Sequence, residues 1–293
     1  MNYRHAFHAG NFADVMKHTI LALVIEHLKL KPSPFRIIDT HAGAGRYALD
    51  ADAAMRTGEW RNGIGRLLAG DLPPEIARML APYFAVIRDA NAVTPGTMEG
   101  MPAIYPGSPL IARGLMRRGD HLVANELHAA DHAELARHFA SDPQTKVLAL
   151  DAWTALKSLL PPKERRGVVL VDPPFEEPGE FHRIADGLRD ATRRFETGIY
   201  LVWYPIKDPK RVRTFRARLA DLGIGKLAVA ELLIRKPVNP DLLNGCGMVI
   251  VNPPYRLAEK LGALLPFLAD RLAAGPGAEG VCDWLGQSPF DQV

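Results

Sequence analysis

Cysteine is scarce in this chain. Its two cysteines, Cys246 and Cys282, do not lie in a metal-ligand spacing, and two isolated thiols exclude a disulfide framework. We therefore expect a reducing, cytoplasmic environment. Long apolar runs are also missing, because the most apolar stretch, residues 19–28, contains Glu26 and His27 and is too short to cross a membrane. The polar start of the chain predicts no signal peptide.

A strong excess of charge of one sign is absent as well. The formal net charge is +3 and the sequence pI is about 8.8, which permits nucleic-acid binding without requiring it. The chain has 293 residues, of which 47% are hydrophobic. This is enough for one large α/β domain, or for one domain that carries an insertion.

Apolar segments typical of strands alternate with helical segments along most of the chain. The expected strands are residues 35–39, 121–126, 146–151, 167–172, 198–204, 226–235 and 246–251. This alternation predicts an α/β fold with a doubly wound, mostly parallel, seven-stranded Rossmann-like sheet. A short loop joins the last two strands, so they should pair antiparallel and leave the last strand antiparallel to the rest.

Residues 48–109 interrupt this rhythm. They contain two or three helical pieces joined by segments rich in proline and glycine, and no convincing strand. We therefore predict a main domain of residues 1–47 and 110–293, with residues 48–109 as an inserted helical subdomain.

Four of the expected strands end in an acidic residue: Asp39, Glu126, Asp151 and Asp172. The carboxyl ends of parallel strands share one edge of a sheet, and ligands bind at that edge. Helix capping would explain any one of these acids. Four acids in equivalent positions favour a ligand site.

A glycine-containing turn follows the first of these acids. Gly43 and Gly45 allow a ligand to approach the backbone closely, and Ala48 completes a Gly-x-Gly-x-x-Ala pattern. An acid after the second strand, here Glu126, typically binds the two hydroxyls of a ribose. These residues alone leave a nicotinamide cofactor possible.

The sequence Asp172-Pro173-Pro174-Phe175 is more specific. It follows the apolar run 167–171, and its prolines cannot continue a sheet ladder. A carboxylate, neighbouring carbonyls and an aromatic ring at a strand end suit a planar amino group, such as the exocyclic amine of adenine. Hydride transfer needs no such turn, so this motif favours methyl transfer to an amino group.

The turn resembles the (Asp/Asn)-Pro-Pro-(Tyr/Phe) motif of the amino-methylating methyltransferases that use S-adenosyl-L-methionine. Residues 3–18 are similar to the opening signature of the RlmJ-type family, the 23S ribosomal RNA adenine-2030 N6-methyltransferases. Further matches to that family lie at residues 39–45, 105–109, 125–128, 172–176 and 203–206. The resemblance therefore covers nearly the whole chain.

The resemblance implies S-adenosyl-L-methionine as the cofactor. It places cofactor contacts at Lys17, His18, His41, Ser108, Glu126, Asp151 and Asp172. The first acidic strand end, the glycine turn and the amide after Asp151 add Asp39, Gly43, Gly45 and Ala152 to the expected cofactor site. In this scheme Glu126 accepts from the ribose hydroxyls, and Asp151 with the Ala152 amide binds the adenine ring. Lys17 suits the methionyl carboxylate.

The resemblance also implies how a target adenine is held. Asp172 and the Pro173 carbonyl would accept the two N6 hydrogens of a flipped adenine, and Phe175 would stack on its ring. Many relatives carry tyrosine at the last position, so a hydroxyl group is missing here. The expected contacts with 23S rRNA are Tyr3, Arg4, Phe175, Tyr204, Lys207, Lys210 and Arg211.

Several readings stay open or are set aside at this point. A DNA adenine methyltransferase and a non-catalytic RNA-binding protein on the same scaffold are the alternatives.

The histidines His5, His8, His18 and His41 lack a thiolate or carboxylate at ligand spacing, so we expect no metal. A second motif at residues 252–255, Asn-Pro-Pro-Tyr, ends the antiparallel strand, and we predict a structural role for it. We expect a monomer.

Overall fold

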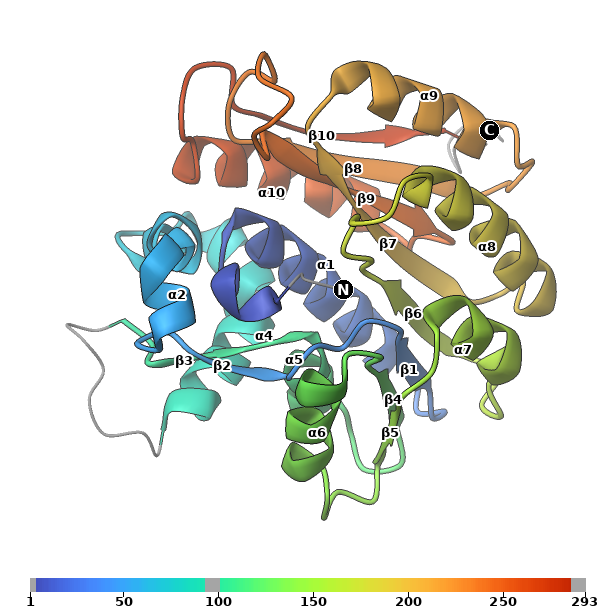
Figure 1. Ribbon diagram of the computed structural model, residues 1–293. Coiled ribbons are helices and arrows are strands. Elements are labelled where there is room, and N and C mark those ends of the chain that lie inside the picture. The colour runs from blue at the N-terminus through green and yellow to red at the C-terminus, as the bar shows by residue number, and fades with distance from the viewer. Residues whose placement is uncertain (1–3, 93–100, 286–293) are drawn as a thin grey trace. The chain divides into compact units, whose positions relative to one another are not determined.

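The computed structural model describes residues 4–92 and 101–285. The chain divides into two compact units, residues 1–152 and residues 153–293 (Figure 1). Among the described residues, no helix has both the length and the apolarity needed to cross a bilayer.

Three parallel strands form the sheet of the first unit. β1 (Arg36–Asp39) pairs with β4 (His121–Asn125), and β4 pairs with β5 (Thr145–Leu148). Parallel neighbours require long crossover connections, and α5 (Ser108–Leu115) and α6 (Ala129–His138) lie in these connections. The strands therefore end at a common edge, as the sequence predicted for this part of the chain.

A buried helix precedes these strands. α1 (Phe12–Lys29) follows the short 3₁₀-helix η1 (His5–Phe7) and begins after Asn11. The Asn11 side chain caps α1 by accepting from the amides of Ala13 and Asp14, each at 3.0 Å. Apolar side chains cover most of the helix, including the fully buried Ile20.

Residues 48–109 contain the helices α2 (Asp52–Thr57), α3 (Arg66–Leu68) and α4 (Pro74–Asn91), and the π-helical turn η2 (Arg61–Gly65). The expectation that this region has no strand is wrong. β2 (Arg46–Ala48) and β3 (Ile104–Pro106) form an antiparallel pair, with Tyr47 opposite Tyr105. Strands of three residues are too short to show an alternating pattern in the sequence.

The second unit combines parallel and antiparallel pairing. β6 (Gly167–Val171) and β7 (Ile199–Ile206) are parallel, whereas β9 (Gly245–Val251) is antiparallel to both β7 and β8 (Leu227–Leu233). The predicted antiparallel pairing of the strands at 226–235 and 246–251 is confirmed. The fold is thus mixed α/β, with mostly parallel strands followed by antiparallel strands toward the C-terminal end.

Helices cover both faces of the strands in this unit. α7 (Ala152–Leu159) starts at the unit boundary, and α8 (Glu180–Arg194), α9 (Pro209–Ala220) and α10 (Leu257–Arg271) follow. In Figure 1, α8 and α9 lie on one side of the strands and α10 on the other. All residues of β6 and β9 are buried, so these strands form the centre of the core.

The predicted main sheet had seven strands, and the described residues add an eighth strand to it. β10 (Glu279–Trp284) follows α10 and pairs antiparallel with β8. Its residues, Glu-Gly-Val-Cys-Asp-Trp, are only partly buried or exposed. A polar edge strand of this kind lacks the apolar run that revealed the other strands.

Candidate active site

The N-terminal part of the first unit is built around the buried carboxylate of Asp14. This carboxylate accepts hydrogen bonds from the amide of Gly10 at 2.8 Å and from His5 Nε2 at 2.9 Å, and it lies 2.8 Å from Lys17 Nζ. Burial alone would raise the pKa of Asp14, but the positive charges of His5 and Lys17 outweigh it and lower the pKa well below its usual value. Asp14 therefore stays ionised and ties residues 5–10 to α1.

Lys17, an expected cofactor contact, is almost completely buried. Its ammonium group is one partner of the ion pair with Asp14. An ammonium carries three hydrogens and can donate to several acceptors at once. A buried lysine of this kind can also bind an anionic group such as a carboxylate.

His18 lies in a buried polar chain. Its Nδ1 is 2.7 Å from the Tyr105 hydroxyl, which in turn lies 2.9 Å from the hydroxyl of Tyr83. Burial lowers the pKa of His18 well below its usual value, so the ring is neutral. Within the described part of the chain, His18 Nε2 has no hydrogen-bond partner, and its nearest acid is Asp14 at 3.8 Å. This orphaned nitrogen is an atom that a ligand could satisfy.

The glycine turn and Glu126 lie together, as predicted. Glu126 accepts from the amide of Gly43 at 2.8 Å and from the amide of His128 at 2.7 Å. Gly43 and Gly45 adopt φ values of +61° and +79°, which glycine tolerates best. Burial raises the pKa of Glu126, although both amides lower it. The result is a fixed carboxylate at the end of β4 with further lone pairs available to hydroxyl donors.

Ser108 and His41 flank this turn. Ser108 is buried at the start of α5, directly after Gly107, whose amide donates to the Gly45 carbonyl at 2.8 Å. The half-buried His41 has its Nδ1 2.9 Å from the Thr40 hydroxyl, and its amide donates to Asp39 at 3.2 Å. The structure therefore brings these expected contacts to the same turn.

Asp151 and Ala152 lie beyond the end of β5. The strand ends at Leu148, so the expectation that Asp151 terminates a strand is wrong. Asp151 is instead an exposed residue immediately before α7, and Ala152 is the buried first residue of that helix. The amide of Ala152 is among those that an α-helix leaves without an internal partner.

The Asp172-Pro173-Pro174-Phe175 turn follows β6 in the second unit. Asp172 is half-buried, and Phe175 has a positive φ of 53°, a conformation that is uncommon for an aromatic residue. The Phe175 ring meets Phe181 at a centroid distance of 5.0 Å and Trp203 at 5.9 Å, both edge to face. Strained backbone of this kind persists where the surroundings hold it, often at functional sites.

Comparison with known proteins identifies the family. The family model described as "Ribosomal RNA large subunit methyltransferase D, RlmJ" matches residues 32–286. This chain belongs to the RlmJ family. It is 39% identical over 286 residues to the ribosomal RNA large subunit methyltransferase J of Escherichia coli, which covers 97% of this chain and 99% of that relative. The protein of the same name from Haemophilus influenzae is 37% identical over the same lengths.

A solved structure has the same fold. The crystal structure of a protein from Legionella pneumophila superposes with a TM-score of 0.82 and 29% identity, and covers 94% of this chain and 98% of that one. The resemblance to the RlmJ family that the sequence motifs indicated is thus confirmed. The chain is a methyltransferase.

The structure argues against one of the expected RNA contacts. Tyr204 is fully buried, and its hydroxyl donates to Glu231 Oε1 at 2.5 Å. Burial, together with the charge of Glu231, raises its pKa well above the usual value. A ring in this position does not reach an RNA base. Neighbouring residues of a strand point to opposite faces, so the preceding residue, Trp203, is the one that contacts the Phe175 ring edge to face.

Four of the other expected RNA contacts lie at the surface. Lys207, Lys210 and Arg211 are exposed around the start of α9. Arg4 is exposed and forms an ion pair with Asp131 at 3.3 Å. Tyr3 lies outside the described residues.

Sequence reasoning missed the role of Asn125, the last residue of β4. Its amide nitrogen donates to the carbonyls of Thr40 at 3.0 Å and Leu150 at 2.9 Å, and its oxygen accepts from the Leu150 amide at 2.9 Å. Asn125 thus joins the glycine turn to the segment that leads into Asp151. The signal was present in the sequence as a polar residue that ends an apolar strand.

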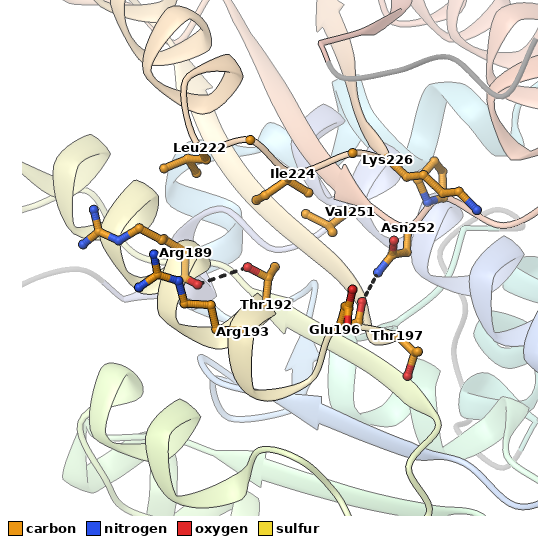
Figure 2. A pocket seen from close by; sticks show the side chains of 13 residues that line it. Arg189, Thr192, Arg193, Glu196, Thr197, Leu222, Ile224, Lys226, Val251 and Asn252 are labelled. Atoms are coloured by element: carbon orange, nitrogen blue, oxygen red, sulfur yellow. Dashed lines mark hydrogen bonds between the residues drawn. The ribbon is translucent and has the colours of Figure 1, made fainter. Parts of the chain in front are cut away.

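The second motif, at Asn252, has a structural role in the second unit. Asn252 Nδ2 donates to the carbonyl of Glu196 at 2.7 Å (Figure 2) and to the carbonyl of Gly198 at 2.8 Å, and both residues precede β7. The antiparallel register places Val251 opposite Tyr200, whereas the parallel register places Val171 next to Val202. Asn252 therefore lies at the opposite strand end from the turn that contains Asp172.

Proposed function

We propose that this chain transfers a methyl group from S-adenosylmethionine to the N6 atom of adenine 2030 in 23S ribosomal RNA. The observation that carries the proposal is the Asp172-Pro173-Pro174-Phe175 turn at the carboxyl end of β6, in a chain that is 39% identical to a ribosomal RNA large subunit methyltransferase. The acid, the adjacent carbonyl and the ring are the groups that an exocyclic amine needs.

The residues of the first unit fit S-adenosylmethionine. Two backbone amides hold the carboxylate of Glu126 in one orientation, which suits the two hydroxyls of a ribose. The buried Lys17 suits the methionyl carboxylate, and the orphaned Nε2 of His18 offers a further polar contact. When bound, this cofactor supplies a methyl group that is activated by its positively charged sulfur.

Asp172 and Pro173 would prepare the attacking nitrogen. The lone pair of an adenine amine is delocalised into the ring, so the amine is a weak nucleophile. Hydrogen bonds from its two N–H groups to the Asp172 carboxylate and the Pro173 carbonyl favour a pyramidal nitrogen with a localised lone pair. Asp172 then accepts the proton that the methylated nitrogen loses. Positioning and electrostatic stabilisation supply the remaining rate enhancement.

The base must leave its stack before it can meet this turn. The Phe175 ring, held between Phe181 and Trp203, provides an aromatic surface for the extruded base. The exposed cations Lys207, Lys210 and Arg211 would bind phosphates of the RNA. We assign Arg4, together with Tyr3, to the substrate side as the family resemblance implies.

We further propose that the enzyme acts as a monomer in the cytoplasm, and that residues 48–109 are an inserted subdomain of the methyltransferase domain 1–47 and 110–293. Light scattering of the purified chain tests the first point, and a deletion that replaces residues 48–109 by a short linker tests the last.

Transfer of a labelled methyl group tests the main proposal. Naked 23S rRNA, ribosomal particles and duplex DNA are offered separately, and the modified position is mapped by mass spectrometry. We expect N6-methyladenine at one position of 23S rRNA. Methylation of DNA but not of rRNA would replace this function by a DNA adenine methyltransferase. Cofactor binding without transfer to any substrate would indicate a non-catalytic RNA-binding protein.

A further inference from the structure

A groove of about 430 Å³ lies between α9 and the end of β8 in the second unit. We call it the α9 groove. Its apolar lining includes Ile206, Val212 and Leu233, and Pro237 contributes from the loop that follows β8. Arg213, an exposed residue of α9, lines it as well. The groove thus combines an apolar surface with a cation.

The α9 groove lies at the same strand end as the Asp172 turn. β6 and β7 are parallel, and β7 continues past the end of β6 to Ile206, which lines the groove. The buried Asn244 holds the β8–β9 loop against this end, because its amide donates to Ile206 at 3.0 Å and its side chain donates to the Lys207 carbonyl at 3.3 Å. The end of the β8–β9 loop is therefore held against the end of β7.

The charges in the groove leave one cation uncompensated. Arg216 is neutralised by Glu231 at 3.0 Å and by Asp283 at 2.7 Å. By contrast, no carboxylate of the described residues forms an ion pair with Arg213. Lys207 and Lys210, which lie next to the lining residues Ile206 and Pro209 in the sequence, are exposed and add further positive charge to this segment. An apolar surface beside an unpaired cation matches the base and the phosphate of a nucleotide.

A second and larger groove, of about 1000 Å³, is less suited to RNA (Figure 2). Its cations are Arg189, Arg193 and Lys226, but Arg189 is bound to Asp186 at 3.2 Å and Glu196 adds negative charge. Figure 2 shows the two arginines on one side and Lys226 on the other. This groove also includes Asn252 and so lies at the strand end away from Asp172.

We propose that the α9 groove binds an unpaired nucleotide of the substrate RNA that flanks the target adenine. Its base rests on the apolar lining, and its phosphate binds Arg213. The site would recognise the RNA context of the target and hold the strand while the adenine is turned out. This inference rests on the proposed function and adds a substrate contact that the motifs do not contain.

Substitution of Arg213 tests the proposal, with Arg193 as the matched control. Both are exposed helix arginines of the second unit, and Arg193 lines the other groove. We expect Arg213→Gln to raise KM for an rRNA fragment about threefold to tenfold and to reduce the slope of log KM against log salt by about one. The kcat at saturating RNA and the Kd for S-adenosylmethionine should not change. Arg193→Gln should behave like the unmodified enzyme.

Photocrosslinking supplies an independent readout. RNA fragments that carry 4-thiouridine at successive unpaired positions beside the target are irradiated with the full-length enzyme, and the linked peptides are identified by mass spectrometry. We expect one position to crosslink to the segments 206–213 or 233–237. A KM that Arg213→Gln leaves within twofold, or crosslinks confined to the groove of Arg193, would overturn the proposal. A wild-type enzyme that methylates no rRNA would instead refute the function on which the proposal rests.

Discussion

Asp172 carries the chemistry of the proposed reaction in a single carboxylate. Asp172→Asn keeps an oxygen that accepts one N–H bond but removes the negative charge and the proton acceptor. We expect kcat for rRNA to fall by about 10²-fold or more, because general-base catalysis contributes an effect of this size. Calorimetry should show that much of the affinity for S-adenosylmethionine remains. Unchanged turnover would remove Asp172 from the catalytic role.

Glu126 is a second residue whose protonation state matters. Its pKa is raised by burial, so the carboxylate takes up a proton at a higher pH than the usual value of 4.5 for glutamate. Ribose hydroxyls donate to the ionised form, and binding of S-adenosylmethionine should therefore weaken as the pH falls through the raised pKa. We expect Glu126→Gln to weaken binding about tenfold at neutral pH and to abolish this pH dependence.

Isothermal titration of the cofactor at several pH values between 4.5 and 7.5 measures both effects, with circular dichroism to confirm that the protein stays folded. A wild-type Kd that does not change across this range would contradict the assignment of Glu126 to the ribose.

Some contacts of the site residues could be predicted from the sequence and others could not. The motifs predicted that Gly43 and Glu126 lie together, because parallel strands end at one edge. They did not predict the side to which Tyr204 points. Trp203 and Tyr204 are adjacent aromatic residues in the same matched motif, and only the strand register decides which of them lies beside Phe175.

At the scale of elements, long strands with apolar runs were predictable and short or polar ones were not. The pairing of β8 with β9 followed from the short loop between them. β2, β3 and β10 were missed because they are either three residues long or only partly buried. The local pattern in such strands is weak, and tertiary contacts decide their conformation.

Asn125 connects three elements of the first unit, and its removal tests what that connection does. Asn125→Ala breaks the side-chain hydrogen bonds to Thr40 and Leu150 and leaves the buried carbonyl of Thr40 without this donor. We expect a loss of stability of about 1–3 kcal/mol and weaker binding of S-adenosylmethionine, because the glycine turn loses a support.

Asn91 offers the matched control. Its side chain also bridges backbone groups, donating to Ile87 and Ile104 and accepting from the Ile104 amide at 2.9 Å, but it lies at the end of α4. Asn91→Ala should lower the denaturation midpoint by a similar amount and leave the cofactor Kd unchanged. Equal effects of both variants on the Kd would show that Asn125 acts only through global stability.

At the scale of the whole molecule, the buried Asp14 makes folding stability depend on pH. The pKa of this carboxyl in the folded protein is well below 3.8, the value for an exposed aspartate. In the unfolded chain the group regains its ordinary pKa, so the unfolded state binds more protons in acid. The ionised carboxylate therefore stabilises the fold fully above pH 3.8, and this contribution is lost as the pH falls toward the lowered pKa.

Asp14→Asn should isolate this contribution. The variant leaves the buried ammonium of Lys17 without its carboxylate, and only one acceptor oxygen remains where His5, Gly10 and Lys17 now share two. We expect a loss of about 3 kcal/mol in the free energy of unfolding at pH 7, which is typical for one partner removed from a buried ion pair. The difference in the free energy of unfolding between the variant and the unmodified protein should shrink below pH 3.8, because the stabilisation by the ionised Asp14 is lost there. Urea unfolding at pH 3, 4, 5 and 7 measures the difference. A gap that stays constant across this range would show that Asp14 acts through packing rather than through its charge.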